Sequence, residues 1–531
     1  MLSRTRRLWW LAGLCSLVVS LGVVLTQGAA ASTSSRQPDL PPPSGPTPST
    51  AKPYAGPAGL PNPWVPLVHK FPGPVNINNG PGPMELELDG SVLVHDACTQ
   101  QWFRLTPDAQ GNYVDGTWSL IAPMPSGYAP LYFGSAILPT GAGVPAGSMI
   151  VEGGEYNGSE CKPVWTNKGA IYNPVTNTWK TVNPPAGWAN IGDAQSNVLN
   201  DGRYIQADCC TTQAALFNPS TLTWTPTGSG KIGINDEGAY SLLQNGNLLT
   251  IDAFDKTSAG LSHTQIYTPS TGAWTNAGLT PDVLVDNNGF ELGPQVTEPA
   301  GKIFAFGAVS DSAIFDEASA TWSRGPNLPT LNGQHYDLAD GAATVLPDGR
   351  ILFGASPELF SPPSHFWTWN GSSFTQVADT ADAPNYPSYV YHFLNLPNGQ
   401  VLMTDFAHIY VWTDTGTPNP AWAPTISSAP SAVTPGSTYT VTGTQLAGRS
   451  QGAAYGDDFQ DNTNYPLVRI TNNATGQVTF APTSNETTLS IAPGAPGSTD
   501  FTVPAGTPSG ASTLQVIGDG IASAGVPVTV S

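Results

Sequence analysis

Short runs of aromatic and β-branched residues, separated by Gly, Pro, Asn and Asp, dominate most of the chain. The stretch Asp201–Gly228 shows the pattern: a turn at Gly202, strand-like runs at Arg203–Ala207 and Ala214–Phe217, and a further run from Trp224. Such runs between turn residues are typical of consecutive antiparallel strands. The pattern therefore predicts an all-β protein built from short strands.

The same unit recurs along the chain. Each copy has a turn glycine followed by a strand-marking aromatic residue; the glycines are Gly90, Gly147, Gly202, Gly246, Gly301, Gly349 and Gly399, and the aromatics Trp118, Trp179, Trp224, Trp274, Trp322, Phe374 and Trp422. The spacing of roughly 45 to 60 residues is close to the kelch period of about 50 residues per four-stranded blade. The turns Asn173–Thr176, Asn218–Thr221 and Thr268–Thr271 lie at one place in the unit, just before the tryptophan. The unit therefore resembles the kelch repeat, and seven copies predict a seven-bladed β-propeller over residues 61–423.

An eighth strand-marking aromatic residue, Trp64, precedes the first complete unit by about one period. We interpret Trp64–Val68 as an outer strand donated to the last blade, which closes the ring and leaves Trp422 in the exit linker. The alternative is an N-terminal arm that packs on the propeller without joining a sheet.

The N-terminal 60 residues lie outside the repeat. Three arginines precede the apolar run Leu8–Leu25, and Ala29–Ala31 provides a cleavage site. This arrangement is typical of a secretory signal peptide over residues 1–31, with an uncleaved membrane anchor as the alternative. Residues 32–60 are rich in Pro, Ser and Gly and predict an extended linker. We therefore expect an exported, extracellular protein.

The repeat also stops near Pro424. Short alternating runs follow at Thr438–Val441, Leu467–Thr471, Gln477–Phe480, Thr487–Ile491, Ser498–Val503, Ser512–Ile517 and Val526–Val530. About seven short strands in about 100 residues predict an immunoglobulin-like (E-set) β-sandwich over residues 424–531.

Charge excludes some partners. The chain has 18 Lys and Arg residues against 38 Asp and Glu residues, a formal net charge of −20. Nucleic acids and anionic membranes require basic patches, so neither is an expected partner. Contact with a membrane is expected only if the signal peptide remains uncleaved.

Four cysteines follow the predicted signal peptide: Cys98, Cys161, Cys209 and Cys210. Their spacing fits no zinc motif, and an exported protein meets an oxidising compartment, so we expect disulfides. One solution pairs Cys98 with Cys161 and Cys209 with its neighbour Cys210. The other joins one member of the vicinal pair to Cys161 or Cys98, and spacing leaves both open.

A kelch propeller followed by a sandwich resembles the galactose oxidase and glyoxal oxidase group of secreted copper-radical enzymes. The segment Gly452–Ile470 adds to the resemblance, because it is similar to the family's segment that carries a copper-binding histidine into the propeller axis. The resemblance implies copper ligands at Tyr391 and His392, which match the family's adjacent Tyr-His pair. It also implies that Tyr132 is the tyrosine that family members cross-link to a cysteine.

Two elements of that family pattern are missing. The cross-linking cysteine is expected around Pro81–Met84, where the chain has none, and the histidine of the sandwich segment is replaced by Gln460. An amide is a weaker copper ligand than an imidazole. These departures favour a function other than copper-radical oxidation.

Acidic residues recur about nine positions before the turn glycines of the third to sixth copies. They are Asp193, Glu237, Glu291 and Asp340. We expect them to meet at one mouth of the propeller axis, with Gln460 nearby, as a binding site. Oxygen ligands of this kind suit calcium; hydrogen bonds to sugar hydroxyls or an acid/base pair are further interpretations.

Two functions follow from these patterns. The first is a secreted module that binds a glycan or a surface partner through the acidic mouth. The alternative is a copper oxidase of carbohydrate alcohols or aldehydes in which Tyr391, His392 and Tyr132 are catalytic. The patterns leave the cofactor unknown: calcium is compatible with the first function, and copper belongs only to the second.

Overall fold

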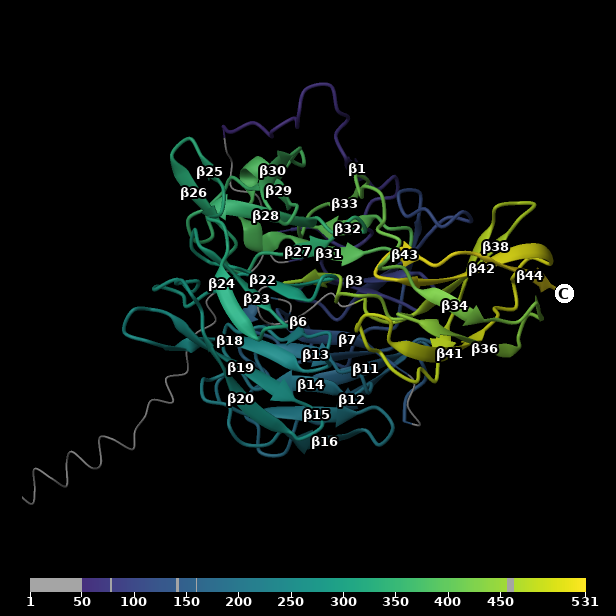
Figure 1. The fold of residues 1–531 in the computed structure, drawn as a ribbon, viewed down its shortest axis with the longest axis horizontal. Coiled ribbons are helices and arrows are strands. Elements are labelled where there is room, and N and C mark those ends of the chain that lie inside the picture. Colours follow the sequence, from purple (N-terminus) through teal and green to yellow (C-terminus); the bar gives the residue numbers. More distant parts are fainter. Residues whose placement is uncertain (1–49, 77–78, 140–142, 159, 456–462) are drawn as a thin grey trace, which may run out of the picture. The chain divides into compact units, whose positions relative to one another are not determined.

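The protein was analysed as a computed structural model that describes residues 50–76, 79–139, 143–158, 160–455 and 463–531 (Figure 1). The predicted signal peptide, most of the predicted linker and Gln460 lie outside the described residues. The fold is all-β, as predicted, and its helices in the described residues are two single 3₁₀ turns, η1 (Ala383–Asn385) and η2 (Ser388–Val390). No helix in this part of the chain is long and apolar enough to cross a membrane.

Consecutive four-stranded antiparallel sheets form the described chain before Pro424. The first sheet contains β2 (Pro81–Leu86), β3 (Val92–Asp96), β4 (Trp102–Thr106) and β5 (Thr117–Leu120). The second contains β7 (Gly134–Leu138), β8 (Ser148–Glu152), β11 (Gly169–Asn173) and β12 (Thr178–Val182). The third contains β13 (Ser196–Val198), β14 (Tyr204–Ala207), β15 (Ala214–Asn218) and β16 (Thr223–Pro226). Strands β14, β15 and β16 cover the runs predicted within Asp201–Gly228.

The next sheets repeat this order. The fourth contains β17 (Ser241–Leu242), β18 (Leu248–Lys256), β19 (Ser262–Thr268) and β20 (Ala273–Leu279), and the fifth β21 (Gln295–Glu298), β22 (Lys302–Phe306), β23 (Ser312–Asp316) and β24 (Thr321–Arg324). The sixth has β27 (Ala343–Val345), β28 (Ile351–Pro357), β29 (His365–Trp369) and β30 (Phe374–Val377), extended by β25 (Thr330–Leu331) and β26 (Gln334–Asp337). A small sheet of β6 (Pro130–Leu131), β9 (Tyr156–Asn157) and β10 (Lys162–Pro163) lies beside the second.

The seventh sheet joins distant parts of the chain. It contains β31 (His392–Asn395), β32 (Val401–Thr404), β33 (Ile409–Trp412) and the N-terminal strand β1 (Trp64–Pro66). Trp64 pairs with Trp412 and Pro66 with Tyr410 in antiparallel register. The predicted addition of the Trp64 segment to the last sheet is therefore confirmed, in place of a separately packed arm.

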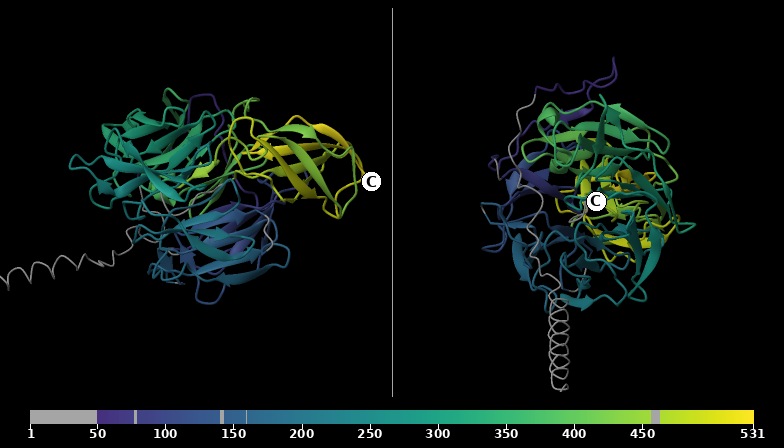
Figure 2. Two further views of the ribbon diagram at one scale, coloured as in Figure 1. Left: turned by 60° about the horizontal axis from the view of Figure 1, so that its bottom comes forward. Right: turned by 90° about the vertical axis from the view of Figure 1, so that its left-hand side faces the viewer.

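The first strands of the sheets contact one another in cyclic order. β2 contacts β7, β7 contacts β13, β17 contacts β21, β21 contacts β27 and β27 contacts β31. Between β13 and β17, the Asn197 side chain donates a hydrogen bond to the Tyr240 carbonyl at 2.8 Å. The cycle returns to its start because β31 contacts β2. Figure 2 shows the sheets following one another around a common centre, an arrangement consistent with a β-propeller.

Two further sheets form the C-terminal region (Figure 1). One contains β34 (Thr425–Ser428), β36 (Thr438–Thr444), β41 (Pro496–Thr502) and β40 (Thr483–Ser484). The other contains β35 (Ala432–Val433), β44 (Val526–Val530), β42 (Gly510–Gly518), β38 (Leu467–Asn472), β39 (Val478–Ala481) and β43 (Ile521–Ala522). Val441 and Phe501 from the first sheet share a buried apolar cluster with Val468, Leu514 and Val528 from the second.

One predicted strand is wrong. Residues Thr487–Ile491 form no strand in the C-terminal sheets. The Leu489 amide instead donates to the carbonyl of Asn200 at 2.9 Å, and the Leu489 side chain joins the apolar cluster of the first three sheets. The alternating apolar residues of this segment therefore pack the C-terminal region against the first three sheets instead of forming a strand.

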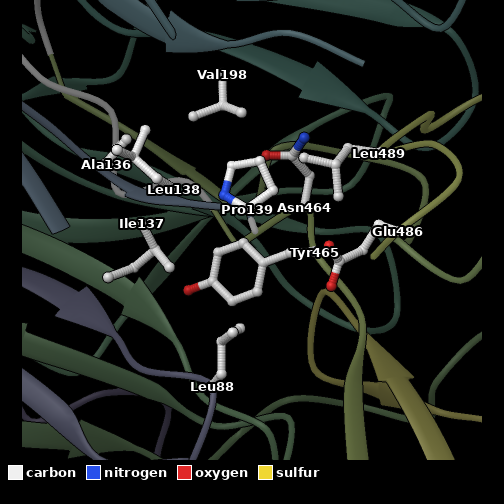
Figure 3. A pocket seen from close by; sticks show the side chains of 10 residues that line it. All are labelled: Leu88, Ala136, Ile137, Leu138, Pro139, Val198, Asn464, Tyr465, Glu486 and Leu489. Carbon is white, nitrogen blue, oxygen red and sulfur yellow. The ribbon is translucent and has the colours of Figure 1, made fainter. Parts of the chain in front are cut away.

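A cavity lies at this contact, between Leu88, Leu138 and Val198 of the first three sheets and Tyr465 and Leu489 of the C-terminal region (Figure 3). Its volume is about 10 Å³. Since a single water molecule needs roughly that much space, the cavity is a packing feature and not a ligand site.

A short two-residue strand also crosses between the regions. β37 (Ala453–Ala454) pairs with β27, with Ala343 opposite Ala454. Just before it, the Gln451 side chain accepts hydrogen bonds from the Leu242 amide at 2.5 Å and the Thr297 hydroxyl at 3.3 Å. The C-terminal region thus reaches the first strands of the fourth, fifth and sixth sheets.

Replacing Trp64 by alanine tests the closure of the seventh sheet. The Trp64 side chain is 5% exposed, its indole donates to the Ala378 carbonyl at 2.8 Å, and its ring lies 4.9 Å from those of Phe366 and Trp412. We expect Trp64→Ala to lower the free energy of unfolding by about 3 to 5 kcal/mol, measured by urea denaturation.

The control is Trp118→Ala, because Trp118 lies half-buried on the outer strand β5 and should lose clearly less. An equal and small loss in both variants would contradict the assigned role of β1.

Candidate functional site

The loops that lead into the first strands of several sheets share an unusual backbone conformation. Tyr132, Glu237 and Asp340 have φ values of 49°, 56° and 46°, and Phe290, next to Glu291, has φ of 70°. Left-handed conformations are uncommon for residues other than glycine and typically cost on the order of 1 to 3 kcal/mol. The recurrence at equivalent places indicates that the loops are shaped to aim particular side chains.

Three of the four predicted acidic residues meet. Oxygen atoms of Glu237, Glu291 and Asp340 all lie within 4.8 Å of one another. They come from the loops before β17, β21 and β27, the first strands of three consecutive sheets. The repeat that places these residues at one position in the sequence therefore also brings them to one point in space. We call this group the carboxylate cluster.

The carboxylate cluster is buried and not exposed to solvent. Glu237, Glu291 and Asp340 are 4%, 0% and 1% exposed. Burial raises the pKa of Glu291 well above its usual value, and the neighbouring charges of Asp340 and Glu237 raise it further. Among the described residues, no N–H group and no alcohol or phenol hydroxyl donates to a Glu291 side-chain oxygen, and the hydrogen-bonding contacts of Glu291 are with the carboxyl groups of Asp340 and Glu237. Buried carboxylates without donors are costly unless they bind protons or a cation.

Asp286 holds the loop that carries Glu291. Its carboxylate accepts hydrogen bonds from the amides of Asn288 at 2.6 Å, Gly289 at 3.0 Å and Glu291 at 2.8 Å. A Cβ at Gly289 would lie 2.7 Å from the Glu291 side chain, so this position requires glycine for close approach. The Asp340 amide donates to the carbonyl of Leu292 at 3.2 Å, which ties the third loop to the second.

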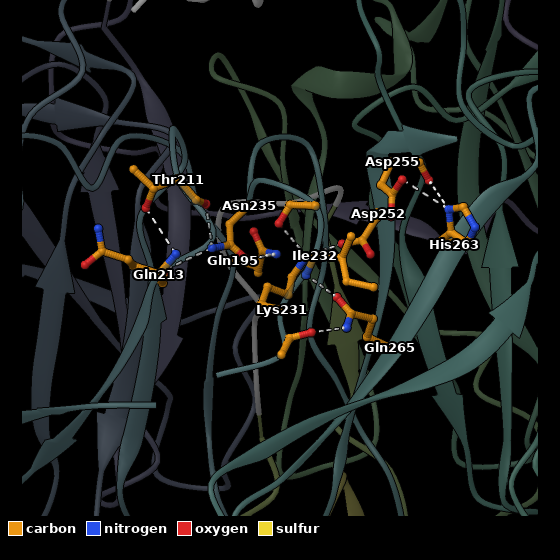
Figure 4. Close-up of polar contacts among 12 residues, drawn as sticks. Gln195, Thr211, Gln213, Lys231, Ile232, Asn235, Asp252, Asp255, His263 and Gln265 are labelled. Carbon is orange, nitrogen blue, oxygen red and sulfur yellow. Dashed lines mark hydrogen bonds and ion pairs between the residues drawn. The ribbon is translucent and has the colours of Figure 1, made fainter. Parts of the chain in front are cut away.

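A polar network fixes the loop before Glu237 (Figure 4). Gln265 accepts from the Ile232 amide at 2.9 Å and donates to the Gly230 carbonyl at 2.7 Å. Asn235 donates to the carbonyls of Thr211 at 3.0 Å and Gln213 at 2.8 Å. The contacts of this loop with two sheets leave Glu237 little freedom to move away from the cluster.

The same loop contains a buried ion pair. Lys231 pairs with Asp252, and their side chains are 2% and 1% exposed. Removing one partner of such a pair typically costs about 3 to 5 kcal/mol, because the other charge stays buried. The pair therefore anchors the loop rather than offering a site.

Asp193, the fourth predicted residue, belongs to another group. Its carboxylate lies within 4.8 Å of Asp236 and Cys209 ligand atoms. The Cys209 amide donates a hydrogen bond to the Ile191 carbonyl at 3.0 Å, which holds the loop of Asp193 beside Cys209. Glu85, a buried acidic residue of β2, accepts a hydrogen bond from the Ser135 hydroxyl at 2.7 Å, and burial raises the pKa of Glu85 to about 8.

The cysteines pair within neighbouring loops. Cys98 is bonded to Cys161, with Cα atoms 5.3 Å apart, and Cys209 is bonded to Cys210. This is the first of the two connectivities considered above. The Asn190 side-chain nitrogen lies 3.9 Å from the Cys210 sulfur, so the vicinal disulfide adjoins the Asp193 group rather than the carboxylate cluster.

The residues implied as copper ligands are divided between different neighbours. His392 stacks on Tyr455, with ring centroids 4.8 Å apart, and Tyr132 stacks on the same ring at 6.4 Å. Tyr391 instead packs against Phe366 at 4.9 Å. Adjacent residues at the start of a strand direct their side chains to opposite faces, which accounts for the separation of Tyr391 from His392.

The described residues do not fit a copper-radical centre. Cys98 and Cys161 share an apolar cluster with Tyr132, but their sulfurs are bonded to each other. Burial lowers the pKa of His392 to about 3, and its ring packs against those of Tyr455 and Phe406. The Tyr455 hydroxyl donates to the Tyr389 carbonyl at 2.7 Å. The arrangement is that of an aromatic packing layer.

Sequence patterns alone did not assign a role to Asp286. The signal was present in the turn Asp286–Gly289, since an Asp followed by Asn and Gly commonly bonds the backbone ahead of it. The carboxylate of Asp236 groups with that of Asp193, whereas the carboxylate of its chain neighbour Glu237 joins the carboxylate cluster. This division depends on side-chain direction, which a sequence does not contain.

Comparison with known proteins yields fold likeness only. No protein-family model and no curated protein matches the chain. A fungal alcohol oxidase of the AA5 family in complex with copper covers 85% of this chain and 85% of its own, at 16% identity and a TM-score of 0.33. A virginiamycin B lyase from Staphylococcus aureus, solved with quinupristin, covers 65% of this chain and 97% of its own, at 9% identity and a TM-score of 0.44. These likenesses are too weak to assign an activity.

The pH dependence of stability tests the burial of Glu291. Its raised pKa means that the folded state holds the proton more tightly than the unfolded state does, so this contribution is present at low pH and is lost as pH rises. Without added cation, wild-type protein should lose stability from about pH 5 to pH 8. Glu291→Gln should lose less stability over the same range, because it has no carboxyl group to release a proton on unfolding.

Thermal unfolding across this pH range measures the effect. Glu160→Gln is the control, because Glu160 is an exposed residue paired with Lys162. Identical pH profiles for wild type and Glu291→Gln would show that folding does not raise the pKa of Glu291.

Proposed function

We propose that the chain is a secreted, seven-bladed kelch-type β-propeller followed by an immunoglobulin-like, E-set sandwich, and that it binds a glycan or another surface partner. The cyclic order of seven sheets and the two packed C-terminal sheets support this architecture. The Cys98–Cys161 disulfide and the signal-peptide pattern are compatible with an extracellular protein. The oxidase alternative receives no support from the positions of Tyr391 and His392.

One observation carries the binding proposal: three carboxylates from three consecutive sheets converge where no amide or hydroxyl donor neutralises Glu291. Calcium prefers several oxygen ligands and is a hard cation of the type this group would hold. With exposures of 4% or less, the same oxygens are poorly placed to hydrogen-bond a sugar directly. The cluster therefore acts as a calcium site that orders the loops around it.

The residues around the cluster suit a polyhydroxylated partner. Asn287 and Asn288 are exposed in the Glu291 loop, and their amides can both donate to and accept from hydroxyl groups. Next to Glu291, the half-buried Phe290 stacks on Phe254 with ring centroids 4.6 Å apart. Exposed amides beside an aromatic pair supply the polar and apolar contacts that a sugar ring requires. Calcium fixes this surface by fixing the loop that carries it.

Calcium titration tests the proposal. Calcium at about a hundred times its dissociation constant should add about 2.7 kcal/mol to the stability of the folded protein. Glu291→Gln and Asp340→Asn should abolish this gain. Binding to immobilised glycans should require calcium, be lost in a chelator, and be lost in both variants.

Asp193→Asn is the matched control, because Asp193 belongs to a separate group and its replacement should leave the calcium response intact. Equal stability with and without calcium would overturn the metal site. Calcium binding without retention on any glycan would keep the site and redirect the search to protein partners.

A further inference from the structure

A further group of ligand-type side chains combines a turn of the seventh sheet with the residue that precedes η1. Asp405 and His408 flank the turn between β32 and β33, and Asp382 directly precedes η1. Ligand atoms of these three residues lie within 4.8 Å of one another. Unlike the carboxylate cluster, this group contains an imidazole nitrogen.

The distances within the group suit a tetrahedral ion. His408 Nδ1 lies 3.3 Å from Asp382 Oδ2 and 3.4 Å from Asp405 Oδ1. Charge-assisted hydrogen bonds are usually shorter, at about 2.7 to 2.9 Å. Zinc bonds of about 2.0 to 2.1 Å set two ligand atoms of a tetrahedral site about 3.3 Å apart. His408 Nδ1 therefore lies from each carboxylate oxygen at the separation expected of two ligands of one ion, and ligand atoms of all three residues lie within 4.8 Å of one another.

Asp405 is held rigidly. Its Oδ1 accepts hydrogen bonds from the amides of Ala407 at 3.0 Å and His408 at 2.6 Å, and the residue is fully buried. Its Oδ2 accepts no hydrogen bond from the described residues. A buried carboxylate oxygen without a donor requires a cation or a proton nearby. The buried Asp405 carboxylate therefore keeps one oxygen to which the described residues supply no donor.

Asp382 is oriented from the other side. It caps η1 without a side-chain hydrogen bond to that turn. Instead, its Oδ2 accepts a hydrogen bond from the Tyr410 hydroxyl at 2.9 Å. Partners of this kind orient metal-binding carboxylates and tune their affinity. The contact leaves the carboxylate directed towards His408.

We propose that Asp382, Asp405 and His408 form a binding site for a zinc-class transition-metal dication. One nitrogen and two oxygen ligands match zinc better than calcium, which takes oxygen ligands alone. The His408 and Asp382 side chains are 43% and 29% exposed, so an ion can enter from solvent. Three protein ligands leave the fourth tetrahedral position for water, as in zinc sites that remain open.

The competing occupant is a proton on His408. The hydrogen bond to Asp405 raises the pKa of His408, burial lowers it, and the charges of Asp405 and Asp382 raise it further while Lys70 lowers it. Tyr410 and Tyr386 also face Asp382, and burial raises both of their pKa values. Since a metal ion must displace the proton, the two occupants are separable by direct metal binding.

Equilibrium dialysis of metal-free protein against zinc tests the proposal, with metal measured by elemental analysis. We expect one zinc per chain from this site, and cobalt substitution should give the visible absorption of a tetrahedral centre. His408→Gln should weaken zinc binding at least about a hundredfold, and Asp382→Asn at least about tenfold.

His69→Gln is the matched control, because His69 is exposed and belongs to no group of potential ligands among the described residues. Glu291→Gln should also retain zinc, which separates this site from the proposed calcium site. Equal zinc binding by wild type and His408→Gln, or none by wild type, would overturn the proposal and leave His408 as a protonated bridge. Unchanged thermal unfolding of metal-free His408→Gln shows that any loss of zinc is not a loss of fold.

Discussion

The pairing of β1 with β33 is the constraint on which the rest of the structure depends. Trp64–Pro66 completes a sheet whose other strands lie more than 300 residues later, and β31 of that sheet contacts β2 of the first. An open end would leave a sheet edge with unpaired backbone groups. Because closure sets the place of every sheet relative to its neighbours, it also sets the separation between the loops of Glu237, Glu291 and Asp340.

That rigidity explains how the chain tolerates an unfavourable arrangement of charge. Two of the three clustered carboxylates, Glu237 and Asp340, have left-handed backbones, and all three are removed from water. The left-handed backbones and the burial of the carboxylates each lower the stability of the folded state, and repulsion between the like charges lowers it further. Hydrogen bonds from the loops to Asp286 and Gln265 hold the arrangement in place. In the proposed calcium site, binding of the cation would offset part of this loss of stability.

The repeat made the fold predictable, because turn glycines and strand aromatics are local signals. It also placed Glu237, Glu291 and Asp340 together, since equivalent positions in successive sheets face the same centre. The sequence misled where direction matters: Asp193 turns towards Asp236, and Tyr391 turns away from His392. The strand expected at Thr487–Ile491 is replaced by a contact with Asn200, which alternation cannot distinguish from strand pairing. The group of Asp382, Asp405 and His408 has no signal in the sequence, because only tertiary contact brings its two loops together.

The two proposed ion sites differ in the property that decides which ion each selects. The carboxylate cluster offers only oxygen atoms inside a closed, low-dielectric environment, which favours a hard cation and slow exchange. The Asp382 group offers a nitrogen beside two oxygens near the surface, which favours a borderline-soft ion and exchange with solvent. Because their donor types differ, neither ion satisfies the other site well. One closed set of sheets can therefore hold an internal ion that fixes its loops and a surface ion with an open coordination position, without competition between them.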